Sequence, residues 1–286
     1  MSMNEKTVDP HQAAAMSLGF MIRTIWQHRQ LISQMTSREI SSRYKGSVLG
    51  IGWSIVNPLI MLAVYTFVFS VVFKSRWDFS NVVHVSASTE VAAILFVGIF
   101  IHALFGEIIN RAPDLIVANQ NYVKRVVFPL EILPIVAVCS ALVNTCVSAF
   151  LVLGMLLLFT GEVHISAVFL PLVIFPLILV ALGIAWIFSS LGVYLRDIRQ
   201  LPAALTTILL FLSPVFYPLT AVPEAFRRVM VLNPLTFVIE QGRSVIIYGN
   251  MPDWSGLVIY TASAVGMAWL GFVWFQYGRK GFADVL

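Results

Sequence analysis

Charged side chains are scarce in this chain of 286 residues. Asp, Glu, Lys and Arg make up 11% of it and apolar residues 59%. A soluble domain has roughly 25% charged and 45–50% apolar residues, and one soluble core of this size could not bury so much apolar surface. In a bilayer, lipid contacts the apolar surface that a soluble core could not bury, so the composition predicts an integral membrane protein. The net charge of only +4 lies in short separate clusters, which excludes a basic stripe for nucleic acid.

The sequence also lacks the groups with which membrane proteins perform chemistry or use ion gradients. It has no HExxH, GxSxG or P-loop motif and no paired carboxylates, and its five histidines are scattered. Ion-coupled carriers need buried acids or histidines, and enzymes need clustered catalytic groups. We therefore expect no catalytic residue, no metal and no cofactor bound by this chain. If it moves a substrate uphill, the energy must come from another polypeptide.

The few reactive groups inside the apolar runs have structural interpretations. Glu107 precedes Arg111 by four residues, so the two can pair on one helix face. His102 is expected to bond a neighbouring backbone carbonyl, with a pore role as the alternative. Cys139 and Cys146 would lie roughly 10 Å apart along one helix, which is too far for a disulfide.

Six apolar runs are candidates for transmembrane helices, and most reach the roughly 20 residues that cross a bilayer core. They cover residues 50–73, 91–109, 132–160, 166–194, 202–222 and 256–276. The sequence therefore predicts an all-α integral membrane fold with six transmembrane helices in one domain, residues 50–276. The flanking tails are residues 1–17, which lack the apolar region of a signal peptide, and residues 277–286.

An even number of spans places both termini on one side of the membrane. Of the eighteen Lys and Arg residues, thirteen lie on that side and five on the other. The positive-inside rule then places both termini in the cytoplasm.

Three segments outside the spans have distinct patterns. Residues 18–45 alternate apolar and polar positions near helical spacing, which predicts an amphipathic interface helix, with a mere membrane anchor as the alternative. Residues 111–131 form an inner loop with mixed polarity, which favours a short helix parallel to the membrane. Residues 223–254, on the outer side, contain apolar runs too short to span, which predicts short interfacial or re-entrant helices.

Aromatic side chains could line an uncharged path, because sugar rings stack on aromatic faces. Tyr65, Phe69 and Phe73 recur every four residues along one helical stripe. The alternative for each ring is contact with lipid or with another helix. The complete set of path candidates is Trp53, Tyr65, Phe69, Phe73, Phe211, Phe216 and Tyr217.

Five fragments in order resemble the export permeases of ABC-2 type, and most closely those for O-antigen polysaccharide. They are the run from Arg38 to Gly50 with Trp53 and Asn57-Pro58; Tyr65 to Lys74; Val126 to Pro134; Tyr194 to Ile198; and Ser213 to Tyr217 with Leu232 to Thr236. Teichoic-acid and capsule exporters are relatives of that family. Each fragment alone is weak, but the ordered set is specific to the class and less specific to the substrate.

The resemblance implies a homodimer in the bacterial inner membrane that binds two copies of a separate cytoplasmic ATPase, which holds ATP and Mg. The transported substrate would be a polysaccharide linked to a lipid carrier, most closely O-antigen on undecaprenyl diphosphate. The interface helix and the inner loop would contact the ATPase. The coupling candidates are Asn121, Tyr122, Lys124, Arg125, Phe128, Leu130 and Glu131. Arg38, Arg43 and Lys45 are candidates for the carrier's diphosphate, with general attraction to anionic lipid as the alternative.

Two other classes compete with an exporter. An ATP-independent sugar facilitator or channel would also need no buried charges, and a neighbouring P-loop gene would argue against it. A membrane acyl- or glycosyltransferase would need a convergent acid and base, which the sequence does not offer.

Overall fold

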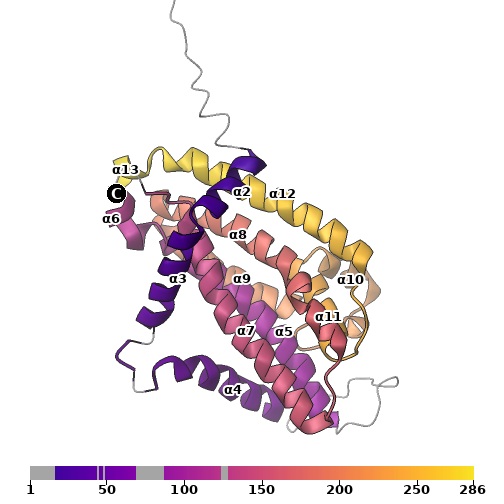
Figure 1. Cartoon of the computed structure of the whole chain (residues 1–286). Coiled ribbons are helices and arrows are strands. Elements are labelled where there is room, and N and C mark those ends of the chain that lie inside the picture. The colour runs from indigo at the N-terminus through magenta and orange to yellow at the C-terminus, as the bar shows by residue number, and fades with distance from the viewer. Residues whose placement is uncertain (1–16, 44, 48, 69–86, 124–127) are drawn as a thin grey trace, which may run out of the picture.

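The computed structural model describes residues 17–43, 45–47, 49–68, 87–123 and 128–286. In these residues all regular secondary structure is helical, as the sequence predicts. Long helices run side by side through the molecule, and the N-terminal helices cross over them near the end that carries the C-terminus (Figure 1).

Four helices among the described residues are long and apolar enough to cross a membrane. They are α5 (Ala87–Arg111), α7 (Ile132–Thr160), α8 (Leu170–Tyr194, preceded by the 3₁₀ turn η5, Ile165–Phe169) and α12 (Trp254–Arg279). These helices confirm the predicted second, third, fourth and sixth runs, with α5 and α12 extending past both predicted ends. The helix α5 is the most buried of the four.

The first and fifth predicted runs give shorter helices. After the 3₁₀ turn η1 (Gly50–Gly52), α4 (Trp53–Thr66) has 14 residues, and α9 (Leu201–Leu212) has 12. At 1.5 Å per residue they measure about 21 and 18 Å, less than the roughly 30 Å core of a bilayer. The end of the first run, residues 69–73, lies outside the described residues.

The fifth run is not one helix over 202–222. Ser213 adopts an extended conformation, because the residue before a proline is disfavoured in the helical region. Its hydroxyl donates to the Leu209 carbonyl, 2.5 Å away, and only the short turn η7 (Leu219–Ala221) follows. The helix α9 packs on α5, where His102 Nε2 lies 2.9 Å from the Thr206 carbonyl oxygen. This contact confirms the backbone bond expected for His102.

The single helix predicted over 18–45 is interrupted. It forms α2 (Leu18–Gln27) and α3 (Arg29–Arg43), which meet at His28. The His28 backbone N–H and its ring Nδ1 both lie against the Thr24 carbonyl oxygen, at 3.1 and 2.9 Å. The helix α2 packs on α12 through the rings of Phe20 and Phe272, and α3 packs on α7 (Figure 1).

Segment 223–254 forms short helices, as its pattern predicts. The helix α10 (Glu224–Val231) exposes large apolar side chains, whereas α11 (Pro234–Ile246) packs against α5 and α8. Asn233 caps α11 by accepting from the Leu235 N–H at 2.9 Å, as is usual for Asn before a helix. The helix α11 is therefore part of the bundle and not a surface loop.

The C-terminal residues fold back onto the bundle instead of forming a loose tail. The helix α13 (Phe282–Val285) follows α12 after a turn. Phe282 is fully buried and contacts the rings of Phe275 and Tyr194, whose centroids lie 5.6 and 5.9 Å away.

Glycines let α8 and α12 approach each other closely. A Cβ added to Gly271 would overlap the Gly183 carbonyl oxygen, and one added to Gly183 would lie 2.5 Å from the Met267 carbonyl oxygen. Ala264 and Ala268 continue this fully buried stripe of α12. Small residues of this kind stabilise membrane helix pairs, because burial of apolar surface contributes little between helices in lipid.

We expect Gly271→Ala to destabilise the bundle by about 1–3 kcal/mol, because the new methyl group overpacks the contact with α8. The midpoint of thermal unfolding in lipid nanodiscs measures the effect. Gly266→Ala is the matched control on the same helix, because a Cβ there meets nothing within 4 Å and alanine favours helices. Equal midpoints for the two variants would contradict the close contact.

Candidate functional site

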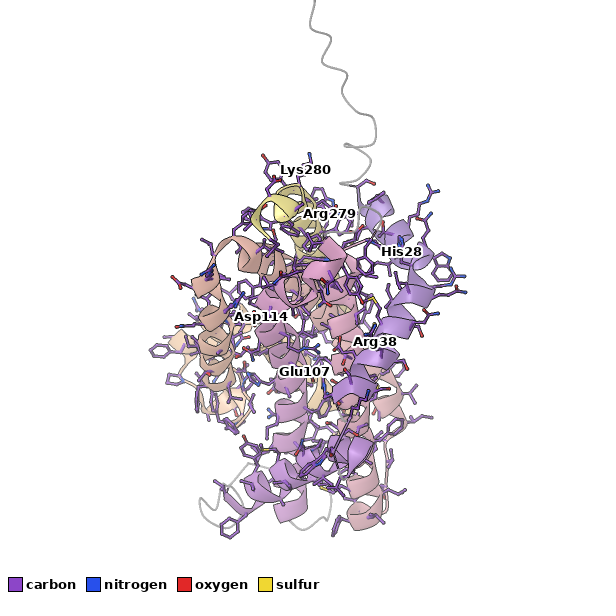
Figure 2. The ribbon with its side chains drawn as sticks, turned by 90° about the vertical axis from the view of Figure 1, so that its left-hand side faces the viewer. His28, Arg38, Glu107, Asp114, Arg279 and Lys280 are labelled. Carbon is purple, nitrogen blue, oxygen red and sulfur yellow. The ribbon has the colours of Figure 1, made fainter. Side chains whose placement is uncertain are left out.

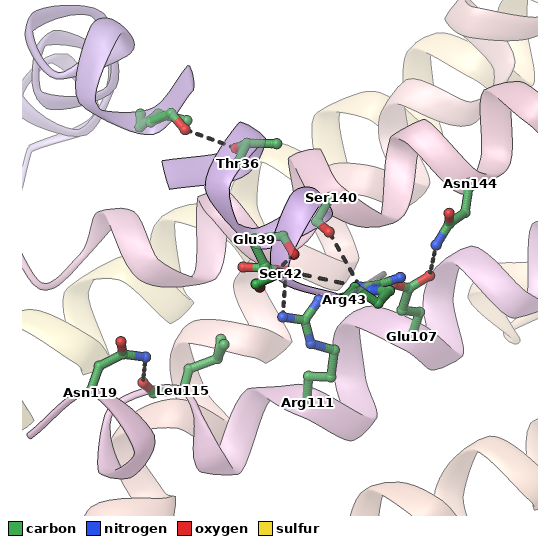
Figure 3. Close-up of polar contacts among 11 residues, drawn as sticks. Thr36, Glu39, Ser42, Arg43, Glu107, Arg111, Leu115, Asn119, Ser140 and Asn144 are labelled. Atoms are coloured by element: carbon green, nitrogen blue, oxygen red, sulfur yellow. Dashed lines mark hydrogen bonds and ion pairs between the residues drawn. The ribbon is translucent and has the colours of Figure 1, made fainter. Parts of the chain in front are cut away.

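Four charged side chains from α3 and α5 meet at one place and form what we call the charge cluster (Figure 3). Its members are Glu39 and Arg43 of α3 with Glu107 and Arg111 of α5. Arg43 Nη2 lies 2.7 Å from Glu107 Oε1, and Arg111 Nη2 pairs with Glu39 Oε1. The pair Glu107–Arg111, expected from helical spacing, is present at 3.8 Å, but the closest contacts run between the two helices.

The third helix, α7, completes the charge cluster with uncharged groups. Arg43 donates to the Ser140 hydroxyl at 3.2 Å, and Asn144 donates to Glu107 Oε2 at 3.0 Å. The four charged side chains are between 23% and 32% exposed. The charge cluster therefore fastens α3 to α5 and α7, and its formal charges cancel.

A cleft of about 510 Å³ lies between α4, α5 and α7. Arg43 and Glu107 form part of its wall, together with the rings of Trp53, Phe96 and Phe100. We call it the α4 cleft. Figure 1 shows α4 set apart from the bundle and converging with the far ends of α5 and α7.

A second cavity, of about 300 Å³, lies beside the charge cluster toward the inner loop. Arg38, Glu39 and Arg111 line it, as does Tyr122. Glu39 and Arg111 thus face this cavity while Arg43 and Glu107 face the α4 cleft, so the charge cluster separates the two spaces. Figure 2 shows Arg38 and Glu107 close together in that view and well away from Arg279 and Lys280 near the C-terminus.

The structure brings three of the predicted path aromatics together. The ring centroids of Tyr65 and Phe216 lie 5.8 Å apart, and those of Phe211 and Phe216 lie 6.2 Å apart. Tyr217 donates its hydroxyl to the Phe211 carbonyl at 2.6 Å. Trp53 lies at the other end of α4, in the α4 cleft, while the predicted residues Phe69 and Phe73 lie outside the described part of the chain.

Sequence reasoning assigned Arg243 to an outer loop, yet its side chain is 1% exposed. Its Nε donates to the Ile94 carbonyl at 3.0 Å, its Nη2 to the Val215 carbonyl at 2.8 Å, and its Nη1 pairs with Glu240 at 3.2 Å. Val215 belongs to the segment that breaks after α9, next to Phe216. Arg243 therefore fixes α11, α5 and that segment together. The sequence signal for it is its spacing of three residues from Glu240, which allows the two side chains to pair on one helix face.

The predicted coupling residues divide into exposed and buried groups. The inner loop begins with short turns, η3 (Ala112–Asp114) and η4 (Val117–Asn119), and continues with α6 (Gln120–Val123). Asn121 is exposed, and the rings of Tyr122 and Phe128 stack with centroids 4.3 Å apart. The predicted residues Lys124 and Arg125 lie outside the described residues.

Leu130 and Glu131 are buried, at 5% and 4% exposure. Glu131 Oε2 pairs with Arg279 at 2.7 Å, and its backbone carbonyl accepts from the Trp186 indole at 3.0 Å. Glu131 therefore holds the end of the inner loop against α8 and α12, and neither side chain lies on the surface.

The three diphosphate candidates differ in environment. Arg38 and Lys45 are exposed, whereas the guanidinium of Arg43 is held by Glu107 and Ser140. An anionic ligand at Arg43 would have to compete with the carboxylate of Glu107.

The long apolar helices form a bundle to which α3 is attached through the charge cluster. The sequence of this chain also matches a known protein family. The chain belongs to the ABC-2 type transporter family, whose model matches residues 30–247. This match confirms the resemblance drawn from the sequence fragments.

Individual relatives carry names of polysaccharide export proteins. The chain is 26% identical over 268 residues to the O-antigen export system permease protein RfbA of Myxococcus xanthus, covering 92% of this chain and 98% of that protein. It is 23% identical over 257 residues to a protein of the same name from Klebsiella pneumoniae, covering 90% and 95%. It is also 28% identical over 225 residues to the polysialic acid transport protein KpsM of Escherichia coli, covering 76% and 81%.

Charge reversal of Arg43 tests the charge cluster. In Arg43→Glu, a third carboxylate replaces the cation beside Glu39 and Glu107, so we expect a loss of about 2 kcal/mol in unfolding free energy. The double variant Arg43→Glu, Glu107→Arg restores the closest pair and should recover most of the loss. Thermal unfolding in nanodiscs measures both. Arg38→Glu, on an exposed position of α3, is the control and should change little; an unrecovered double variant would count against the pairing.

Proposed function

We propose that this chain is the transmembrane permease subunit of an ABC exporter that moves a lipid-linked polysaccharide across the bacterial inner membrane. The match along nearly its whole length to O-antigen export permeases carries this proposal. A separate ATPase subunit would supply the energy. The likeness to the polysialic acid transport protein favours a capsular polysaccharide as the second candidate substrate.

The proposed subunit has six transmembrane segments. The four long helices would span the membrane, and α4 and α9 would complete their spans with the residues that follow each helix. Burial of α11 against α5 and α8 supports a re-entrant position for this outer helix. Contact of α2 with α12 near Phe272, together with the excess of Lys and Arg on that side, supports cytoplasmic termini.

The proposed assembly is a homodimer with two ATPase subunits on its cytoplasmic side. Asn121, Tyr122 and Phe128 would contact the ATPase, because they lie at or near the surface of the inner loop. Leu130 and Glu131 would act as positioning residues, since both are buried. A push on α3 would reach α5 and α7 through the charge cluster, and so would alter the α4 cleft.

The diphosphate of the lipid carrier would lie near Arg38 and Lys45 at the cytoplasmic surface. Their exposure supports this role, as does the attraction of basic residues to anionic headgroups, about 1 kcal/mol each. The rings of Tyr65, Phe211 and Phe216 would line the later part of the path. Arg243 would support them, because it binds the backbone carbonyl of Val215, next to Phe216.

Genetic complementation tests the proposed function. Deleting the gene should remove the polysaccharide from the cell surface and leave it inside on its lipid carrier. The chain together with its ATPase should restore export, and an ATPase with a substituted P-loop lysine should not. If the purified chain alone moves polysaccharide into vesicles without ATP, it is a facilitator and the exporter proposal is wrong.

A second prediction concerns the inner loop. Phe128→Asp should abolish the stack with Tyr122 and weaken ATPase binding by about tenfold, which is the effect expected of a central interface residue. Polysaccharide export and ATPase copurification are measured in the same membranes. Asp114→Asn is the control on the same loop, and it alters an exposed ion pair with Arg199, which lies between α8 and α9. Normal export by Phe128→Asp would show that the stacked rings of Tyr122 and Phe128 are not part of the ATPase contact.

A further inference from the structure

Uncharged polar side chains from α4 and α7 line the α4 cleft. Asn144, Thr145 and Ser148 line it from α7, and Ser54 and Asn57 line it from α4. Asn144 lies twelve residues into α7, about 18 Å along a 29-residue helix. Lipid cannot satisfy polar groups at that depth, and Asn144 donates instead to the Glu107 carboxylate.

The hydroxyls on α7 retain capacity to accept hydrogen bonds. Thr145 donates to the Ala141 carbonyl and Ser148 donates to the Asn144 carbonyl, each at 3.0 Å. A hydroxyl has one donor and two acceptor sites, so its lone pairs are still available after such a bond. These hydroxyls can therefore bind a ligand that presents hydroxyl protons.

The cleft also has flat apolar surfaces, which aromatic rings of α4 and α5 provide. Phe96 and Phe100 pack edge to face on α5 with centroids 6.2 Å apart, and both line the cleft. Trp53 of α4 also lines it and is 36% exposed. A ligand that fits both the polar and the aromatic groups has an apolar face and a rim of hydroxyls, which is the chemistry of a sugar ring.

The charges beside the cleft favour an uncharged ligand. Arg43 and Glu107 already neutralise each other at 2.7 Å, and an anionic group would have to break that pair. Sugar hydroxyls would not, because a guanidinium has five donor hydrogens and a carboxylate about four acceptor sites. The cleft volume of about 510 Å³ lies within the range of small-molecule sites.

We propose that the α4 cleft is a binding subsite for uncharged sugar units of the exported glycan, separate from the carrier's diphosphate. This inference rests on the proposed export function. Sugar rings stack on Trp53, and Asn57 and the α7 hydroxyls bind their hydroxyl groups. Because Arg43 and Glu107 belong to the charge cluster, a sugar in the cleft also touches the connection to α3.

Binding of lipid-free glycan to the full chain with its ATPase in nanodiscs tests the subsite. The probe is the host's own surface polysaccharide, released by mild acid and purified free of lipid; titration calorimetry gives its affinity. We expect Trp53→Leu and Asn57→Leu to weaken binding about tenfold, the loss of roughly 1.4 kcal/mol for a stacked ring or hydrogen bond. Trp53→Phe, which keeps a ring, should bind nearly as wild type does.

Ile60→Ala is the matched control, since Ile60 is an exposed residue of α4 that does not line the cleft, and it should leave the affinity unchanged. Inorganic pyrophosphate should not displace the glycan. Equal affinities in all variants, or displacement by pyrophosphate, would overturn the subsite. Asn57 is exposed, so its variant should fold even if Trp53→Leu does not.

Export by the same variants separates the two proposals. If wild-type chain restores export while Trp53→Leu and Asn57→Leu bind glycan normally, the subsite is wrong and the exporter stands. If wild-type chain with its ATPase restores no export, the proposed function itself fails.

Discussion

The attachment of the N-terminal helices to the bundle depends on the interhelical ion pairs of the charge cluster. In a chain with only 11% charged residues, two Glu–Arg pairs join the N-terminal helix α3 to α5, and Ser140 and Asn144 extend the contact to α7. Each side chain is about a quarter to a third exposed, so the pairs are only partly screened by water. A movement of α3 relative to α5 must stretch or exchange these pairs.

Two other features hold the rest of the bundle together around the charge cluster. Glycine contacts bring α8 and α12 together, and the buried guanidinium of Arg243 joins α11 to α5 and to the break after α9. Both features are rigid. The glycine contact leaves no room for a methyl group, and opening the Arg243 contacts would leave a buried charge unpaired. By comparison, α4 packs on only one side of the bundle beside an open cleft. Rearrangement during transport is therefore expected at α3 and α4.

The two proposed sites lie beside α3 and α4, the helices that are expected to move. The inner loop reaches the charge cluster through the cavity that Tyr122 and Arg38 line. The α4 cleft reaches it from the other side through Arg43 and Glu107. An ATPase contact and a glycan subsite would thus lie on opposite faces of one small set of ion pairs, which gives a short physical route between them.

Local sequence patterns determined the membrane class, the four long helices, the Glu107–Arg111 pair and the backbone contact of His102, because these depend on composition and on spacing along one helix. The tertiary structure alone decided which charges meet across helices, since Glu39 and Arg111 are 72 residues apart in sequence. It also decided that Arg243, Leu130 and Glu131 are buried and that the C-terminus is docked. Such facts depend on how helices pack, and periodicity within a single helix does not specify its neighbours.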